Sequence, residues 1–292
     1  MGIRVESIGI SENNNGYSAT TVDLIRDAAI RCFQRSRYPK EDIGILLNVS
    51  VYHHDHIEEP AYASIIQNSL ELNHKKENSL GPRTFSFDVL NGSFGVLNGC
   101  HIANAMITSG KTKTVLLVSG DIVNEDEATP GICFTGVAMV LDSAEDESAG
   151  FTSFYFSTYS ELQELYESYV YYEGTKLCFT FHKDPSLQQI YINTIARGLG
   201  EYLNSCATRL DEFDFIIPPQ ISPSFVSELS KAIGAGSDRM IDVSLSDGDL
   251  FNASFPKAFA YLVDNKLTSP GKKALAVFVG SGIQIGFAAY NF

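Results

Sequence analysis

Residues 85–110 constrain the fold more than any other stretch of the chain. An apolar segment at 85–89 runs into the tight polar turn Asn91-Gly92-Ser93, and a helical pattern over 95–110 then ends on a glycine. Glycine is common just after a helix because it adopts the left-handed backbone conformation without strain. A strand, a sharp turn and a helix in this order have the geometry of a nucleophile elbow, which presents the residue at its apex, here Ser93, beside a helix N-terminus.

The composition fits a globular protein with enough chain for a full core. Of the 292 residues, 44% are hydrophobic and 19% are charged, and no apolar run is long enough to span a membrane. The first residues lack the apolar core of a signal peptide. A net charge of −14 makes nucleic acid and anionic membranes poor partners. Five cysteines without metal-binding spacing favour reduced thiols, so we expect a cytoplasmic protein.

Predicted strands and helices alternate along the chain. Strands are expected at 3–8, 43–51, 85–89, 114–120, 136–142, 150–156, 213–218, 240–243, 274–280 and 283–290. Helices are expected at 18–34, 60–72, 95–109, 183–203, 222–233 and 255–265, while 161–174 is hard to assign. This alternation predicts an α/β sheet covered by helices. Two similar halves, 1–143 and 144–292, indicate an internal duplication, and the lack of a flexible linker between them predicts one compact unit.

This duplicated pattern resembles the thiolase fold and, within it, the β-ketoacyl-acyl-carrier-protein synthase III group. Asp88-Val89 with Ser93 and Gly95 is similar to the group's Asp-Val-x-x-x-Cys-x-Gly stretch. Pro218-Pro219-Gln220 falls on its Pro-His-Gln-Ala-Asn motif, and Gly248-Asp249 falls on its Gly-Asn-x-Ser-Ala-Ala-Ser motif. The resemblance covers nearly the whole chain. It implies two βαβαβαββ halves that form a layered α-β-α-β-α sandwich.

The departures from that group concern all three positions that carry its chemistry. In the group, a cysteine takes the acyl group as a thioester, while a histidine and an asparagine stabilise decarboxylation of malonyl carrier protein and hold the thioester oxyanion. The corresponding residues here are Ser93, Pro219 and Asp249. A serine hydroxyl needs a general base at neutral pH, and proline cannot supply one. Because Asp249 is anionic at neutral pH, it would oppose an enolate, and the resemblance therefore implies that no catalytic residue is intact.

These positions also have structural interpretations. Ser93 is either a small residue that fits the turn or a serine that accepts an acyl group. Asp249 is expected to cap a turn, and Asn252, which might otherwise replace the lost asparagine, is expected to be structural. The histidine-rich loop 53–56 looks like a metal site, but adjacent loop residues rarely converge on one ion, so we expect neither a metal nor another cofactor. We expect the remaining polar candidates to be surface, capping or core residues: His101, His182 and Cys100.

The favoured hypothesis is a non-catalytic ketosynthase III-like subunit. Thiolase-fold enzymes dimerise about a two-fold axis, and in the synthase group the residue before the proline of the second helix lines the neighbour's acyl pocket. That residue is Glu59 here. We expect a heterodimer or heterotetramer with an active, cysteine-bearing subunit that condenses or transfers acyl groups in fatty-acid, polyketide or secondary-metabolite biosynthesis. Acyl-CoA or acyl carrier protein would bind through that partner, because the group's carrier-docking arginine corresponds to Ser224.

Two other functions compete with this hypothesis. The chain could be a free-standing acyltransferase or thioester hydrolase that uses Ser93 as its acyl acceptor. The sequence Asn91-Gly92-Ser93-Phe94-Gly95 also resembles the elbow of an α/β-hydrolase. That interpretation is disfavoured because the first glycine of the motif is missing and no histidine follows His182, whereas a hydrolase places its histidine near the end of the chain.

Overall fold

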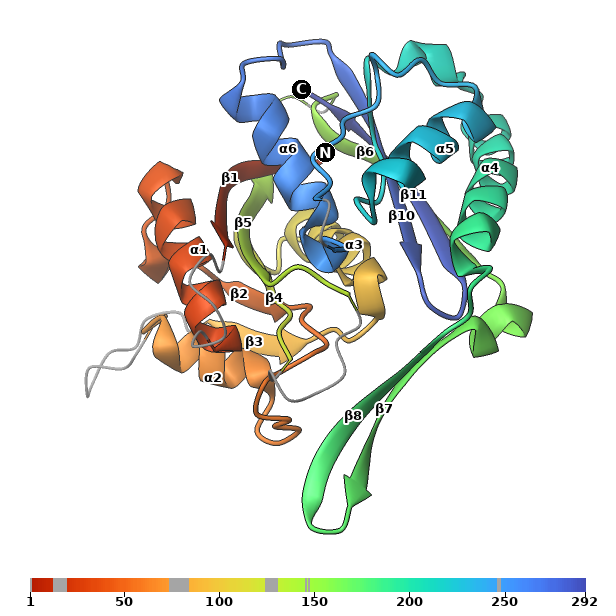
Figure 1. Ribbon diagram of the computed structural model, residues 1–292. Coiled ribbons are helices and arrows are strands. Elements are labelled where there is room, and N and C mark those ends of the chain that lie inside the picture. The colour runs from red at the N-terminus through yellow and green to blue at the C-terminus, as the bar shows by residue number, and fades with distance from the viewer. Residues whose placement is uncertain are drawn as a thin grey trace.

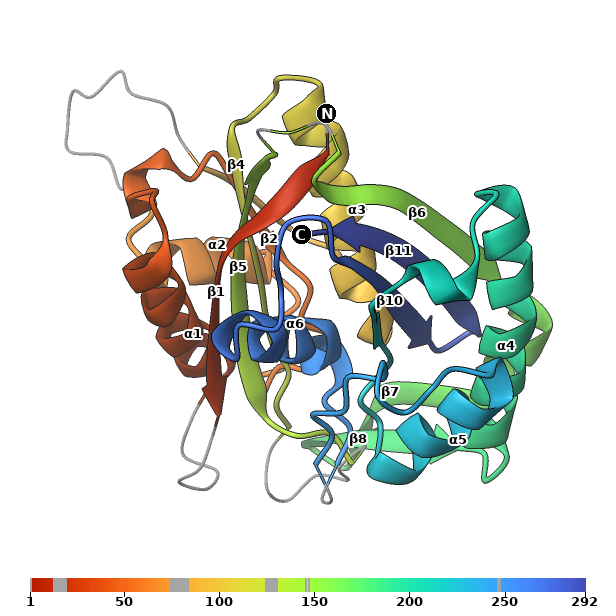
Figure 2. The same ribbon diagram turned by 90° about the horizontal axis from the view of Figure 1, so that it is seen from above.

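The structure, a computed structural model, describes residues 2–12, 20–73, 84–123, 131–144, 146, 148–245 and 248–292. These residues form two large β-sheets, a separate two-stranded hairpin and three layers of helices. One helical layer lies between the sheets and one covers the outer face of each sheet (Figures 1 and 2). This arrangement confirms the α-β-α-β-α layering that the resemblance to the thiolase fold implied.

The first half of the chain follows the predicted order β-α-β-α-β-α-β-β. Its elements are β1 (Ile3–Glu12), α1 (Thr21–Arg35), β2 (Ile45–Asn48), α2 (Tyr62–Ser69), β3 (Phe85–Asp88), α3 (Gly95–Thr108), β4 (Thr114–Gly120) and β5 (Thr135–Ser143). The strands form one sheet in the order β1-β5-β4-β2-β3. β2 runs parallel to β3 and β4, whereas β5 runs antiparallel to β1 and β4. Within the described residues, β3 is thus an edge strand.

The second half repeats this plan with a hairpin inserted. Its elements are β6 (Gly150–Thr158), β7 (Tyr166–Glu173), β8 (Lys176–Lys183), α4 (Leu187–Ser205), β9 (Phe215–Ile217), α5 (Pro223–Ile233), α6 (Ser254–Asp264), β10 (Lys273–Gly280) and β11 (Gln284–Asn291). The order β6-β11-β10-β9 forms the second sheet, while β7 and β8 pair only with each other. The predicted cap of α5 is confirmed, since the hydroxyl of Ser222 accepts a 3.1 Å hydrogen bond from the backbone N–H of Phe225.

The hairpin β7–β8 is where the sequence prediction fails most clearly. Residue 183, the expected first residue of a helix, is the last residue of β8, and the helix starts at Leu187. His182 therefore lies in a strand and not on or beside a helix. The reason lies in the tertiary structure. Phe179 and Phe181 lie on the same face of β8, and both pack against the ring of Tyr52, which belongs to the first half of the chain.

Two smaller predictions also need correction. The expected strand at 240–243 is reduced to an isolated bridge between Met240 and Ile216. The helix expected to start at Pro60 starts at Tyr62, after a cis peptide bond between Glu59 and Pro60.

Buried strands divide their side chains between the layers. In β4 every residue is buried; Val115 and Leu117 pack against the central helices, and Leu116 and Val118 pack against α1 and α2. Successive side chains of a strand point to opposite faces, so a strand covered on both sides reads as one continuous apolar run. The helix α3 approaches this sheet closely at Gly99, where a Cβ atom would overlap the side chain of Leu117. This close packing fixes the N-terminus of α3, and with it the elbow, against the sheet.

Candidate functional site

The elbow forms at the end of β3, as predicted. Residues 92–94 make a 3₁₀ turn that leads directly into α3, and Gly92 has a φ of 53°, which glycine adopts without strain. The side-chain amides of Asn91 and Gln284 of β11 exchange hydrogen bonds, both 2.9 Å long. The elbow of the first half is thus tied to the second sheet.

The hydroxyl of Ser93 bonds to the backbone. Its Oγ donates a 2.7 Å hydrogen bond to the carbonyl oxygen of Val279 in β10. A peptide carbonyl does not take up a proton at neutral pH, so this contact orients the hydroxyl without activating it as a nucleophile.

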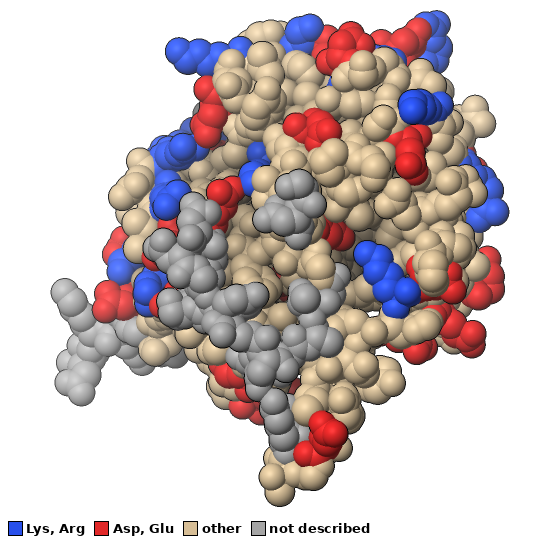
Figure 3. Space-filling view, in the orientation of Figure 1, with Lys and Arg blue, Asp and Glu red and all other residues tan. Residues whose placement is uncertain are grey.

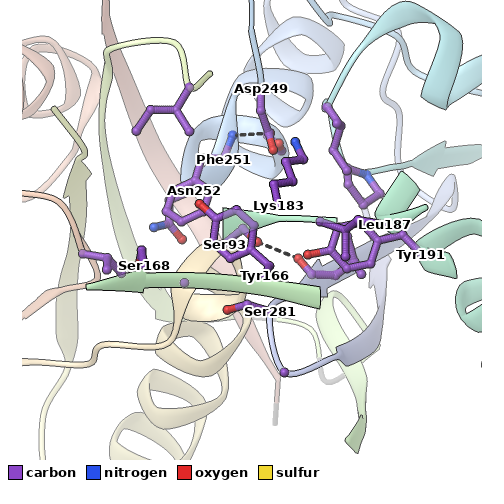
Figure 4. A pocket seen from close by; sticks show the side chains of 18 of the residues that line it. Ser93, Tyr166, Ser168, Lys183, Leu187, Tyr191, Asp249, Phe251, Asn252 and Ser281 are labelled. Atoms are coloured by element: carbon purple, nitrogen blue, oxygen red, sulfur yellow. Dashed lines mark hydrogen bonds between the residues drawn. The ribbon is translucent and has the colours of Figure 1, made fainter. Parts of the chain in front are cut away.

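Ser93 lines a cavity of about 810 Å³, a volume typical of small-molecule sites (Figure 4). Pro219 and Asp249 line the same cavity, so the structure brings together the three positions that the sequence singled out. Among the described residues that line it, none is a histidine, a cysteine or an arginine. The cavity therefore offers no imidazole or thiol from the described part of the chain.

Pro219 follows β9 and is held by its neighbour. Gln220 is fully buried, and its Nε2 donates 2.9 Å hydrogen bonds to the carbonyl oxygens of Pro218 and Ile241. Its Oε1 accepts a 2.8 Å bond from the N–H of Val243. Gln220 thus has a structural role, and the adjacent Pro219 lines the cavity.

Asp249 caps a turn, as the sequence analysis expected. Its Oδ1 accepts a 2.7 Å hydrogen bond from the N–H of Phe251, and its backbone bonds to Gly131 and Cys133 at 2.8 Å each. Burial raises the pKa of this carboxyl to about 6, although the N–H of Phe251 and the charge of Lys183 oppose the rise. Asp249 is therefore mostly anionic at neutral pH and can accept a proton in mildly acidic solution.

Asn252 is held by both hydrogens of its side-chain amide. Its Nδ2 donates 3.1 Å hydrogen bonds to the carbonyl oxygen of Val49 and to the carboxylate of Asp121. Asp121 also accepts bonds of 2.6 and 3.0 Å from the N–H groups of Val51 and Tyr52. With both hydrogens used, the amide has no donor left for a bound oxyanion, and its role is structural.

The hairpin β7–β8 contributes one wall of the cavity, which the sequence analysis did not identify. Tyr166 and Ser168 of β7 line the cavity, and their hydroxyls lie 3.1 and 3.3 Å from the hydroxyl of Tyr52. Lys183 of β8 and Tyr191 of α4 also line it (Figure 4). The aromatic residues of 155–172 and the alternation in β8 are the sequence signals that could have revealed this wall.

Glu59 is exposed and is not among the described residues that line the cavity. The nearby helix α2 is anchored by Asp88, whose carboxylate accepts bonds of 2.7 and 2.8 Å from the N–H groups of Tyr62 and Ala63. A carboxylate at a helix N-terminus is stabilised by the unpaired N–H groups there. Asp88 of the family-like motif thus positions α2 next to the elbow strand.

The remaining candidates do not join this site. The ring of His53 stacks on Tyr62 at a centroid distance of 3.7 Å, and burial lowers its pKa. His101 lies on the exposed surface of α3, as expected, while Cys100 is buried and burial raises the pKa of its thiol to about 12. Within the ranges that the structure describes, no group of three or more His, Cys, Asp or Glu residues could hold a metal ion. No helix in those ranges is long and apolar enough to cross a membrane.

Residues 87–160, which include the elbow, match the family model of 3-oxoacyl-[acyl-carrier-protein (ACP)] synthase III. The β-ketoacyl-[acyl-carrier-protein] synthase III of Acholeplasma laidlawii is 23% identical over 301 residues, which cover 97% of this chain and 87% of the relative. That of Neorickettsia sennetsu is 24% identical over 276 residues, which cover 92% and 83%.

Solved structures show the same fold. The 3-oxoacyl-[acyl-carrier-protein] synthase III of Aquifex aeolicus superposes with a TM-score of 0.82 at 16% identity and covers 100% of both chains. The chain is a thiolase-fold protein that resembles β-ketoacyl-ACP synthase III. A cysteine-to-serine variant of Xanthomonas campestris OleA, solved with lauric acid and lauroyl-CoA, superposes on this synthase III-like chain with a TM-score of 0.83 at 17% identity, covering 100% of this chain and 99% of OleA.

Proposed function

We propose that the chain is a non-catalytic ketosynthase III-like subunit that pairs with an active, cysteine-bearing thiolase-fold partner in the cytoplasm. The pair condenses or transfers acyl groups in fatty-acid, polyketide or secondary-metabolite biosynthesis, and acyl-CoA or acyl carrier protein binds through the partner. One observation carries the proposal: Ser93, Pro219 and Asp249 share one cavity to which the described residues contribute no imidazole or thiol.

The chemistry of these residues opposes acyl transfer in three ways. The proton of Ser93 is donated to a carbonyl oxygen, which cannot remove it. Pro219 has neither a base nor a donor in its ring. Asp249 carries negative charge at neutral pH, and negative charge beside a developing oxyanion or enolate raises the barrier that an oxyanion hole lowers.

Exposed apolar side chains support the pairing. Phe85 at the start of the edge strand β3 is 62% exposed, and Leu90 just after it is 63% exposed. An unpaired strand edge with exposed apolar residues is a ready site for association with another chain. Glu59, which is also exposed, is proposed to reach the partner's acyl pocket.

The hairpin β7–β8 offers a second apolar surface. It extends from the body of the molecule, and uncharged side chains lie beside an acidic patch at the lower tip of the molecule in Figure 3 (Figures 1 and 3). Tyr172 in this hairpin is 73% exposed, and Tyr169, Val170 and Tyr171 are exposed as well. Tyrosine is enriched in protein interfaces because it combines a large apolar area with a polar tip. We propose that this hairpin also contacts the partner.

The alternative is a free-standing acyltransferase or thioester hydrolase that uses Ser93. The observation in its favour is that Ser93 lines a cavity large enough for an acyl chain, together with a carboxyl that can take up a proton near pH 6. In this function Asp249 would have to act as the base for the serine.

Purification of the tagged chain from its native cells tests the pairing. We expect a thiolase-fold protein with intact cysteine, histidine and asparagine to co-purify in stoichiometric amount. The reconstituted pair should turn over acyl-CoA, and the activity should vanish when the partner's cysteine is replaced by alanine. A stable homodimer that turns over acyl-CoA alone, and loses that activity with Ser93→Ala, would instead establish the alternative.

A further inference from the structure

One oxygen of the Asp249 carboxylate has no hydrogen-bond partner among the residues that the structure describes. Its Oδ1 accepts the N–H of Phe251, whereas no hydrogen bond or ion pair joins Oδ2 to any described residue. Lys183 points toward Asp249 and influences it through its charge, but no ion pair joins the two (Figure 4). The side chain of Asp249 is half-buried, so this second oxygen is open to the cavity and can accept a hydrogen bond from a bound donor.

The cavity around this acceptor favours positive charge. The charged residues that line it are Glu167, Asp184, Asp249 and Lys183, three acidic side chains and one basic. A lining with excess negative charge attracts cations and repels phosphates and carboxylates. The anionic ends of acyl-CoA and of free fatty acids therefore meet repulsion here.

The remaining walls of the cavity are largely apolar and suit a ligand with a hydrocarbon body. Leu187, Phe251 and Phe255 line the cavity, together with Val277 and Phe278 of β10. A small number of polar groups in a largely apolar wall is the usual composition of a small-molecule site.

We propose that this cavity binds a ligand with a primary amine on an apolar body, with the amine donating to Asp249. The proposal rests on the proposed function in one respect only: it takes the cavity as a binding site and not as the place where an acyl-enzyme forms.

The binding depends on pH through Asp249 itself, and four other titratable groups face this carboxyl. These are Lys183 of β8 and three phenols, Tyr52, Tyr166 and Tyr191. Burial raises the pKa of each phenol, so all three stay neutral in the range where Asp249 changes charge. Asp249 takes up a proton as the pH falls through about 6, and amine affinity should fall as it is protonated.

Three probes of equal chain length test the proposal on the full chain by calorimetry at pH 7.5: octylamine, octanol and octanoate. We expect octylamine to bind about tenfold more tightly than octanol, since a paired charge in a partly buried site contributes at least this factor, and octanoate to bind most weakly. Asp249→Asn should remove the advantage of octylamine over octanol. Asp27→Asn, an exposed change on α1, is the matched control.

Two results would overturn the proposal. One is octanoate binding as tightly as octylamine, and the other is octylamine binding that is equal in the wild type and in Asp249→Asn. Because these measurements use the isolated chain, they are independent of whether a partner co-purifies. The ligand class and the pairing can therefore fail separately.

Discussion

The hydroxyl of Ser93 lies 2.7 Å from the carbonyl oxygen of Val279, so the apex of the elbow in the first half is bonded to β10 in the second. The contact joins the two sheets at the cavity. The serine hydroxyl donates its one proton to this structural hydrogen bond. In a site with a nucleophilic serine, the proton would instead point to a base that removes it.

Ser93→Ala should leave the activity of the reconstituted pair within about twofold of wild type. The variant should lose about 1 kcal/mol of unfolding free energy, because the hydrogen bond to Val279 is removed. Urea unfolding measures the stability, and intact mass after incubation with octanoyl-CoA measures acylation. An acyl adduct on the wild-type chain that disappears in the variant would contradict the proposed function.

Asp249→Asn should stabilise the chain at pH 7.5 and not at pH 4. The pKa of Asp249 is raised from 3.8 to about 6 in the folded protein, so the folded state binds this proton more tightly than the unfolded state. Its contribution to stability is complete below pH 3.8 and is lost as the pH rises through 6. The full pKa shift of Asp249 corresponds to about 3 kcal/mol of unfolding free energy. Because the side chain keeps some exposure to solvent, we expect Asp249→Asn to stabilise the chain by about 1–2 kcal/mol at pH 7.5.

Asp184→Asn is the control for this pH dependence. Hydrogen bonds from the side chain and backbone of Ser186 lower the pKa of Asp184, so its variant should be less stable than wild type at pH 7.5. Equal stability changes for the two variants, measured by urea unfolding at both pH values, would show that burial of Asp249 is not the cause.

Asn252→Ala should reduce the unfolding free energy by about 2–3 kcal/mol. The change removes the donor that the carbonyl oxygen of Val49 and Oδ2 of Asp121 share. Both residues are buried, and Oδ2 then keeps the hydroxyl of Ser119 as its donor. Asn204→Ala, an exposed change near the end of α4, should change stability by less than about 0.5 kcal/mol. Urea unfolding of both variants provides the comparison, and similar losses would argue against a structural role for Asn252.

Phe85→Ser and Tyr172→Ser should each weaken association with the partner about tenfold or more, because large side chains at interface centres carry much of the binding energy. Tyr261→Ser on α6 removes a similarly exposed ring from another part of the surface and should leave association unchanged. Sedimentation of the purified pair reports the affinity. Unchanged association in both β3 and hairpin variants would exclude these two surfaces.

The alternation of strands and helices was predictable because it depends on local periodicity. The apolar run at 114–120 and the capped helix at 223–233 are confirmed, since a buried strand and a capped helix carry their signals within a few residues. The hairpin β7–β8 was not predictable in this way. Its strands are stabilised by contacts with Tyr52, more than 100 residues earlier in the chain.

The sequence by itself determined the alternation of strands and helices, because apolar periodicity is a local property. Its resemblance to the synthase III group implied the layered fold and the three residues at the site. Only the tertiary structure decided what those residues can do. In the folded chain Ser93 donates its proton to the carbonyl oxygen of Val279, and Asn252 donates both hydrogens of its amide to buried acceptors. Asp249 lines the cavity. Hydrogen-bond partners and burial depend on segments distant in sequence, and these set the chemistry of each group.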